Sequence, residues 1–508
     1  MPSSDRPRRP DDRSTHRAPK ARSAQRPAER GRTADPARLA AYTVLRAVAG
    51  GGYANLELPA ELRRRRLRGR DAAFATELTY GTTRLHGIYD RIIAIAADRP
   101  VERIDGGVLD TLRLGIHQVL AMRVPPHAAA DESVALARQV NGAGAAGLVN
   151  AVMRRVTEAD LDTWLTRIVP SNAEPLDRLA ITTSHPEWIV RALRQALLGH
   201  GSATADNVEE GLAALLAADN RPAEVTIAAR PGLVEPAELE AAGALAHPVV
   251  ATAWQLTGGD PGGIAAVRDG RAAVQDAGSQ VVALALAAAP ALAGPAGGPV
   301  TRVRWLDMCA GPGGKAGLLA ALARAEGADL VANEIAPHRA DLVRQTLRPL
   351  MESAPADGPQ VTVRVGDGRE IGADDPAAYV RVLVDAPCTG LGALRRRPEA
   401  RWRRSPSDLA TLGGLQRQLL ISALDAVATG GVVAYATCSP HLAETSFVVS
   451  DVLKKRPDIE QLDARSIVEE VAPEWAGTLG QGPGVQLWPH RHDTDGMFLA
   501  LLRKHPTA

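Results

Sequence analysis

The spacing of apolar residues changes once along the chain, near residue 300, and this change restricts the fold more than any other feature. From about 35 to 160, apolar residues recur every three or four positions, which predicts helices throughout. Beyond 300, short valine-rich runs alternate with helical stretches at 315–325, 337–351 and 407–428, the last of them stopped by Gly430-Gly431. The runs are Val303–Leu306, Asp329–Ala332, Val361–Val365, Val380–Val384 and Gly431–Ala436. This alternation predicts a mainly parallel sheet with helices on both faces.

The 508 residues are enough for two or three domains with their own cores. We expect a basic tail over 1–34, an all-α bundle over 35–160, a small mixed α/β connecting subdomain over 161–290 and an α/β domain over 291–508. The first helix should begin at Asp35-Pro36, because an N-cap residue followed by proline is typical of a helix start. Ala223–Ala228 and Pro248–Leu256 are predicted strands of the connecting subdomain, and Ala288–Pro299 is a predicted surface loop.

Charge is concentrated at the N-terminus. Residues 1–32 hold ten Arg and Lys against four Asp and Glu, so this segment carries +6 and the remainder −5 of the total of +1. With so few apolar residues the tail should be disordered, and it serves either to raise affinity for a polyanion or only to aid solubility. Three cysteines, no apolar run near 18 residues and no apolar leader after the N-terminus predict a cytoplasmic protein without a membrane span.

Acidic residues follow four of the five valine-rich runs. They are Asp307, Glu334, Asp367 and Asp385, and Thr437-Cys438 follows the fifth run. Because ligands bind outside the carboxyl ends of the strands in such sheets, these residues should share one edge. A single aspartate there is often only a helix N-cap, but four acidic residues together with a glycine loop indicate a ligand site.

The glycine loop lies between the first predicted strand of this domain and its first helix. It reads Asp307-Met308-Cys309-Ala310-Gly311-Pro312-Gly313-Gly314-Lys315. Glycines there let the backbone approach a ligand at the helix N-terminus. The spacing matches neither a Walker A loop nor the dinucleotide-binding pattern G-x-G-x-x-G. Since Glu334 could accept hydrogen bonds from two ribose hydroxyls, the loop favours a cofactor that carries a nucleoside without a pyrophosphate.

All three cysteines fall in the predicted loops at this edge. Cys309 is interpreted as a buried, inert thiol. Cys388, in Asp385–Gly390, and Cys438, in Thr437-Cys438-Ser439-Pro440, should each lie at a strand end beside an acidic residue, which favours a chemical role. No Cys/His spacing supports a zinc site, so no metal is expected.

The ten residues from Arg395 to Arg404, shortly after Cys388, include six arginines. The predicted RNA-binding residues of this arginine cluster are Arg395, Arg396, Arg397, Arg401, Trp402, Arg403 and Arg404. Guanidinium groups can bind phosphates and an indole can stack on a base, although a charge run is more often a solvated face. A second run, Arg63–Arg66 with Arg68 and Arg70, gives the predicted helical bundle a basic patch of its own.

These residues resemble the Sun/Fmu family of RNA cytosine-5 methyltransferases. Asp307–Lys315 resembles the cofactor loop of that family, Asp385–Gly390 and Thr437-Cys438-Ser439 its two cysteine motifs, Gln275–Gln280 its upstream motif and Asp495–Phe498 its closing strand. The helical part resembles the NusB-like domain of the bacterial branch that acts on ribosomal RNA. The matching segments there are Thr76–Arg84, Leu112–Gly115, Val124–Ala129 and Val149–Arg155.

The resemblance implies a Rossmann-like class I methyltransferase domain that binds S-adenosyl-L-methionine. Its implied contacts are Cys309, Ala310, Gly311, Pro312, Gly313, Gly314 and Lys315, with Glu334 on the ribose, Asp367 by the adenine and Asp385 between cofactor and target base. It further implies that Cys438 is the nucleophile and that Cys388 helps to release the product. Thr389 and Gly311 depart from the family pattern, which has serine and alanine there.

The implied reaction is methylation of carbon 5 of a cytosine in 16S ribosomal RNA, by a monomer. A tRNA enzyme of the same family would carry the same catalytic motifs, and only the helical domain favours ribosomal RNA. A non-catalytic NusB-like RNA-binding protein would be expected to lack Cys438 or the glycine loop, and this chain has both. A DNA cytosine-5 methyltransferase would lack the second cysteine motif.

Overall fold

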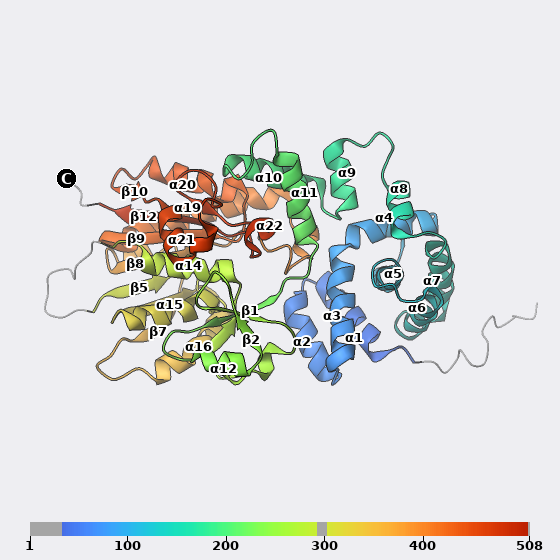
Figure 1. The fold of residues 1–508 in the computed structure, drawn as a ribbon, viewed down its shortest axis with the longest axis horizontal. Coiled ribbons are helices and arrows are strands. Elements are labelled where there is room, and N and C mark those ends of the chain that lie inside the picture. The colour runs from blue at the N-terminus through green and yellow to red at the C-terminus, as the bar shows by residue number, and fades with distance from the viewer. Residues whose placement is uncertain (1–32, 292–301, 506–508) are drawn as a thin grey trace, which may run out of the picture.

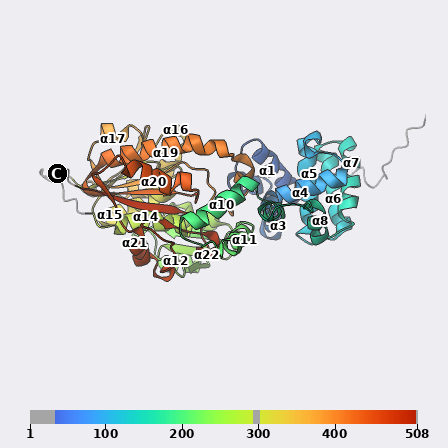
Figure 2. The same ribbon diagram turned by 90° about the horizontal axis from the view of Figure 1, so that it is seen from above.

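A computed structural model describes residues 33–291 and 302–505. An all-helical part lies beside an α/β part, and the two meet along one side of each (Figures 1 and 2). Most of the predicted tail, and most of the predicted loop 288–299, fall outside the described residues. None of the described helices is long and apolar enough to cross a membrane.

The N-terminal part is a helical bundle around α5. Asp35 caps the first helix, as expected, by accepting a hydrogen bond from the backbone N–H of Arg38 at 3.0 Å. Apolar residues of α4, α5 and α7 form its main core, and Trp164 and Ile168 of α8 pack into the same core. The helices are α1 (Pro36–Ala49), α2 (Ala54–Arg64), α3 (Gly69–Arg84), α4 (His86–Ala97), α5 (Gly106–Leu120), α6 (Pro126–Val140), α7 (Ala143–Val156) and α8 (Leu161–Ile168).

The connecting region contains five further helices and a small antiparallel sheet in the order β2-β3-β1-β4. The first predicted strand, Ala223–Ala228, corresponds to β1. Of the second, Pro248–Leu256, only Ala253–Leu256 forms a strand, β3, because the residues before it turn back from β2, which was not predicted. The elements are α9 (Pro175–Thr182), α10 (Glu187–Gly199), α11 (Val208–Asp219), β1 (Val225–Ala229), α12 (Pro236–Ala241), β2 (Ala244–Ala246), β3 (Ala253–Leu256), α13 (Ala265–Arg268) and β4 (Ala272–Val274). The next helix, α14 (Ala277–Ala288), packs on the large sheet instead.

The C-terminal part is built on an eight-stranded sheet in the order β10-β12-β9-β8-β5-β6-β7, with β11 paired to β12. Strands β5 to β9 are parallel to one another, whereas β12 is antiparallel to β9, and β10 and β11 are antiparallel to β12. The strands are β5 (Arg304–Asp307), β6 (Asp329–Glu334), β7 (Val361–Val365), β8 (Tyr379–Asp385), β9 (Val427–Thr437), β10 (Ile459–Gln461), β11 (Val485–Gln486) and β12 (Phe498–Lys504). The prediction of a mainly parallel sheet is confirmed.

Helices cover both faces of this sheet, as expected. One core includes residues of α14, α15, α16 and α21, and the other includes residues of α17, α19 and α20. The helices are α15 (Gly314–Ala325), α16 (Pro337–Glu352), α17 (Ile371–Asp374), α18 (Ala400–Arg403), α19 (Pro406–Ala426), α20 (Ser446–Leu453), α21 (Ala464–Val471) and α22 (Pro489–His492).

One boundary differs from the expectation. Gly430-Gly431 does not stop α19, which ends at Ala426, and the following strand already begins at Val427 opposite Tyr379. Gly430 lies inside β9 with a φ of 76°, and a Cβ on Gly431 would lie 2.7 Å from the carbonyl oxygen of Val380. These glycines therefore allow β9 to approach β8 closely at an irregular point of the pairing, and they do not end the helix.

Candidate cofactor and catalytic site

The glycine loop joins the end of β5 to the start of α15, as predicted. Gly313 has a φ of 113°, a conformation that favours glycine. A Cβ on Gly311 would lie 2.2 Å from a carboxylate oxygen of Glu334, so even an alanine there would force that carboxylate to move. The loop therefore exposes backbone rather than side chains to the space at the helix N-terminus.

Glu334 ends β6 with its side chain 1% exposed. Its carboxylate accepts hydrogen bonds from the backbone N–H groups of Gly311 at 3.1 Å and Ala336 at 2.9 Å, and it pairs with Arg339 at 2.5 Å. Because Arg339 is 47% exposed, its guanidinium can leave while the backbone bonds continue to hold the carboxylate. A buried acceptor fixed beside a glycine loop fits the ribose of a nucleoside cofactor.

Asp307 lies at the start of the loop, and both of its carboxylate oxygens are buried without a hydrogen-bond partner among the described residues. Burial, with the nearby negative charge of Asp385, raises its pKa to about 7. An unpartnered buried carboxylate is costly unless a positive group arrives. This site thus fits a cationic cofactor such as S-adenosyl-L-methionine, which carries a sulfonium and an ammonium group.

The other predicted cofactor residues differ in their hydrogen-bond and ion-pair partners. Lys315 donates to Asp385 at 2.9 Å, so an ion pair links the loop to the end of β8. Burial alone would lower the pKa of Lys315, but the Asp385 carboxylate raises it. Asp367, beyond β7, instead bonds locally to the backbone N–H and the guanidinium of Arg369. Burial raises the pKa of the Cys309 thiol far above its usual value, consistent with an inert thiol.

The two cysteine motifs meet at the carboxyl ends of β8 and β9. The sulfur atoms of Cys388 and Cys438 lie 3.4 Å apart, and both are free thiols. Their hydrogen bond raises the pKa of Cys388 and lowers that of Cys438, against the effect of burial. The positive charges of Arg397 and Lys315 further lower the pKa of Cys438. Cys438 is therefore the thiol of the pair that ionises first, which is what a nucleophile requires.

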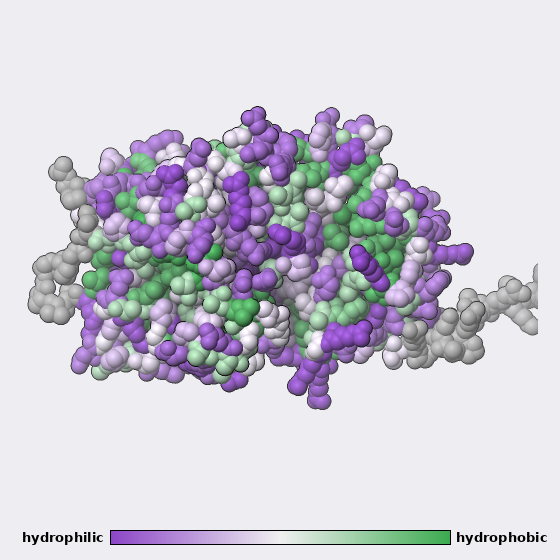
Figure 3. Space-filling model, in the orientation of Figure 1, coloured by the Kyte–Doolittle hydropathy of each residue, from purple (hydrophilic) through white to green (hydrophobic). Residues whose placement is uncertain are grey.

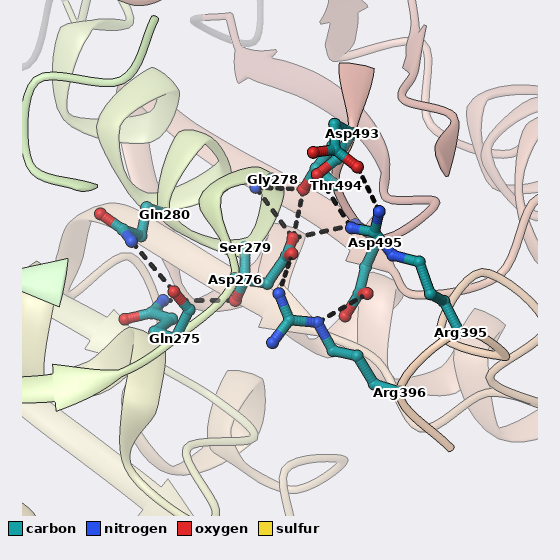
Figure 4. Close-up of polar contacts among 10 residues, drawn as sticks. All are labelled: Gln275, Asp276, Gly278, Ser279, Gln280, Arg395, Arg396, Asp493, Thr494 and Asp495. Carbon is teal, nitrogen blue, oxygen red and sulfur yellow. Dashed lines mark hydrogen bonds and ion pairs between the residues drawn. The ribbon is translucent and has the colours of Figure 1, made fainter. Parts of the chain in front are cut away.

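The structure corrects the prediction that the whole arginine cluster faces RNA. The side chain of Arg395 is 4% exposed and pairs with Asp493, and Arg396 pairs with Asp276 and Asp495 (Figure 4). Thr494 and the backbone N–H of Asp495 also donate to Asp276. Arg396 thus links the segment after Cys388 to the two motifs at 275–280 and 495–498, and it supplies the positive charge that the buried Asp276 and Asp495 need.

Arg401 is also buried, with none of its surface exposed. It donates to the side-chain oxygen of Asn220 at 2.7 Å and to the carbonyl oxygens of Asp219, Ser184 and Arg84. Arg84 belongs to α3 of the helical part, so this guanidinium ties that part to the catalytic part.

Two more arginines of the cluster make internal bonds. Arg403 donates to the carbonyl oxygens of Val48 and Gly52, and Arg404 donates to that of Thr389 at 3.2 Å. Only Arg397 and Trp402 remain exposed, with the guanidinium of Arg397 over the ring of Tyr53 and Trp402 beside His86. The sequence could not indicate these pairings, because the partners lie up to 355 residues away.

One functional candidate could not be found from the sequence. Glu444, at the end of the short helix η4 (Leu442–Glu444), is fully buried and bonds to both cysteine loops. A glutamate six residues after Cys438 carries no signal of this role. No group of three or more His, Cys, Asp and Glu that could hold a metal occurs in the described part of the chain.

A glycine loop, a buried acidic residue on the next strand and two thiols lie at one edge of the sheet, which is typical of a class I methyltransferase, and a helical bundle is joined to this domain. The family described as 16S rRNA methyltransferase RsmB/F matches residues 298–503, and the NusB family matches residues 35–158. The chain belongs to the RsmB/F family of RNA methyltransferases, whose methyl donor is S-adenosyl-L-methionine.

Individual relatives agree with this assignment. The chain is 49% identical over 484 residues to the putative methyltransferase Rv1407 of Mycobacterium tuberculosis, covering 94% of this chain and 98% of the relative. It is 30% identical to the ribosomal RNA small subunit methyltransferase B of Pseudomonas putida, covering 92% and 98%. A solved structure, that of PH0851, has the same fold with a TM-score of 0.73 at 19% identity, covering 93% of this chain and all of that one.

Glu334→Ala should weaken S-adenosyl-L-methionine binding by roughly 1.5–3 kcal/mol for each charge-assisted hydrogen bond that the alanine cannot make. Isothermal titration calorimetry measures this directly. Arg339→Ala is the matched control, since it removes only the exposed partner of the same carboxylate and should leave binding intact or tighter. Equal cofactor affinity in wild type and Glu334→Ala would contradict the ribose assignment.

Arg401→Met should lower the free energy of unfolding by about 3–5 kcal/mol, because it leaves buried oxygen atoms without their donor. Urea titration followed by circular dichroism measures the change. Arg348→Met, at a position on α16 whose side chain is 65% exposed, should change stability by no more than about 0.5 kcal/mol. Equal destabilisation of the two variants would contradict the conclusion that the buried bonds of Arg401 stabilise the fold.

Proposed function

We propose that the protein methylates carbon 5 of a cytosine in 16S ribosomal RNA through a covalent adduct with Cys438. The observation that carries this proposal is the pair of thiols 3.4 Å apart, next to the ion pair that joins the cofactor loop to β8. Methyl transfer to oxygen or to an amino nitrogen needs no thiol, whereas carbon 5 of cytosine is too weak a nucleophile to react without one.

In the proposed mechanism, the Cys438 thiolate adds to carbon 6 of the ring, and the electron pair displaced makes carbon 5 nucleophilic. S-adenosyl-L-methionine supplies an electrophilic methyl group bound to a sulfonium. The methyl group would pass from the sulfonium to carbon 5, leaving a neutral thioether. Water or another base would then accept the carbon 5 proton, and the electron pair of that C–H bond would re-form the 5,6 double bond. The carbon–sulfur bond to Cys438 then breaks, and the thiolate is restored. The base must leave its stack to present carbon 6 to the thiolate.

The neighbouring residues have distinct proposed roles. Asp385, held by Lys315, would hydrogen-bond the ring and stabilise its changed protonation during addition. Cys388, whose pKa is raised, stays protonated beside the nucleophile and assists release of the product. Asp367 would lie by the adenine, and the backbone of Cys309–Lys315 would line the cofactor.

We choose ribosomal RNA over transfer RNA for two reasons: the helical domain, and the names of several relatives, which refer to ribosomal RNA. The match to the NusB family and the full-length similarity to ribosomal RNA small subunit methyltransferase B favour ribosomal RNA. Bisulfite sequencing of total RNA from a deletion strain tests this choice, since loss of one protected cytosine in 16S RNA supports it and loss in tRNA contradicts it. A cytoplasmic monomer remains a prediction from the sequence.

RNA contacts are proposed for the exposed part of the arginine cluster and for the helical domain. Arg397 and Trp402 are exposed beside the domain junction, and Tyr53 at the start of α2 is 41% exposed. Four arginines near the end of α2, Arg63, Arg66, Arg68 and Arg70, are exposed as well. Hydrophilic side chains cover much of the visible face of both parts, with apolar patches among them (Figure 3). The exposed guanidinium groups named above are the ones that suit a polyanionic partner.

The two cysteines should give opposite phenotypes. Cys438→Ala should abolish methylation and form no protein–RNA adduct, because the attacking sulfur is gone. Cys388→Ala should still attack and methylate but release slowly, so an adduct should accumulate on denaturing gels. Cys309→Ala is the control and should stay active. Adducts in Cys438→Ala and none in Cys388→Ala would mean that Cys388 is the nucleophile.

Arg397→Ala should lower RNA affinity and flatten the dependence of log Kd on log salt by about 0.7–0.9, because one phosphate is no longer neutralised by the guanidinium. Filter binding across a salt series measures this slope. Arg348→Ala, which removes an exposed charge from the far end of α16, should leave the slope unchanged. A wild-type slope in Arg397→Ala would remove this residue from the RNA surface.

A further inference from the structure

Glu444 is a buried carboxylate that the catalytic scheme does not use. It lies at the end of η4, just beyond the loop that carries Cys438, and none of its surface is exposed. An ionised carboxylate in such a place is costly unless several donors surround it. Its hydrogen-bond partners therefore show what keeps it there.

The partners come from both cysteine loops. One carboxylate oxygen accepts hydrogen bonds from the backbone N–H of Thr389 at 2.8 Å and from the side-chain amide of Gln416 at 3.2 Å. The other accepts from the hydroxyl of Thr389 and from that of Ser439 at 2.6 Å. Thr389 follows Cys388 directly, and Ser439 follows Cys438 directly. One side chain thus bridges the residues next to the two thiols.

Further bonds reinforce this bridge. Gln416 of α19 also donates to the carbonyl oxygen of Pro387 at 2.9 Å, on the other side of Cys388. The hydroxyl of Tyr435 donates to the backbone carbonyl of Glu444 at 2.7 Å. The position of Glu444 is therefore fixed by β9 and α19, and through it the two loops are fixed relative to each other.

The charge of Glu444 also acts unequally on the two thiols. After the hydrogen bond with Cys438 and burial, the negative charges of Glu444 and Asp385 further raise the pKa of Cys388. The charge of Asp385 also raises the pKa of Cys438, whereas the positive charges of Arg397 and Lys315 lower it. Asp385 thus acts on both thiols in the same direction, whereas Glu444 opposes ionisation of Cys388 and the two cations favour ionisation of Cys438. This arrangement favours ionisation of Cys438 before Cys388.

We propose that Glu444 is a positioning residue that holds the two cysteine loops together and keeps Cys388 protonated beside an ionised Cys438. This inference rests on the proposed function for its catalytic meaning, since only the adduct mechanism needs the two thiols in different protonation states. The structural part of the proposal, that the two thiols are held in place and differ in pKa, can be measured without RNA.

Glu444→Gln is the informative variant, because the amide keeps the shape of the side chain and can donate to the two hydroxyls that formerly donated to it. The first measurement is the rate of iodoacetamide alkylation at each cysteine, followed by peptide mass spectrometry between pH 6 and 9. In wild type, Cys438 should react at lower pH than Cys388. In Glu444→Gln the ratio of the two rates near pH 7 should fall about tenfold, which corresponds to one pKa unit.

Glu238→Gln is the matched control, since it makes the same change of side chain in α12 of the connecting region, where the carboxylate pairs with Arg271 and does not bridge the cysteine loops. Its alkylation ratio should equal that of wild type. Circular dichroism and S-adenosyl-L-methionine titration should show that both variants are folded. If Glu444→Gln fails to fold, Ser439→Ala, which removes a single donor, should give a smaller shift of the ratio in the same direction.

A second measurement connects the thiol pair to the reaction. RNA transcribed with 5-fluorocytidine should trap the Cys438 adduct, because fluorine cannot leave carbon 5 as a proton does. Glu444→Gln should form this adduct at least about tenfold more slowly than wild type, with unchanged cofactor affinity. An unchanged alkylation ratio in Glu444→Gln overturns the role of Glu444, whereas absence of any adduct in wild type overturns the proposed function instead.

Discussion

The buried ion pairs around Arg396 hold together three segments that are far apart in the sequence. Asp276 precedes α14, Asp495 precedes β12, and Arg396 follows the first cysteine motif. Burial alone would raise the pKa of Asp276, but the charge of Arg396 and the hydrogen bond from Thr494 hold it below its usual value. Removing any one partner would leave a buried charge without compensation, so these segments depend on one another.

This dependence extends from the catalytic site to the helical domain. The same stretch of chain that carries Arg396 continues to Arg401 and Arg403, which bond to carbonyl oxygens of the helical domain. Arg404 bonds back to Thr389, next to Cys388. The residues between the first cysteine motif and α19 therefore connect the thiols to the domain matched by the NusB family. These bonds therefore give that domain a defined position relative to Cys438.

Periodicity and motif spacing were sufficient to predict the sheet, its helices and the residues at its carboxyl edge. Those predictions depend on local patterns, such as the valine runs that became β7 and β8, and on the rule that parallel strands end at one edge. The arginine cluster could not be interpreted in the same way. Six arginines in ten residues look solvated, and their burial follows from aspartates and carbonyl groups that only the fold brings near. Gly430-Gly431 was misread for the same reason, since the neighbouring strand determines its role.

The contrast between Glu334 and Glu444 shows why one acidic residue was predictable and the other was not. Glu334 ends a strand, so its place at the ligand edge follows from the topology. Glu444 lies in a short helix beyond the edge, and its importance follows only from the four donors around it. A reaction that needs two adjacent thiols in different protonation states requires both loops to be held to within a fraction of an ångström. Hydrogen bonds to a shared buried carboxylate satisfy that requirement, because any movement of one loop leaves a charge unsatisfied.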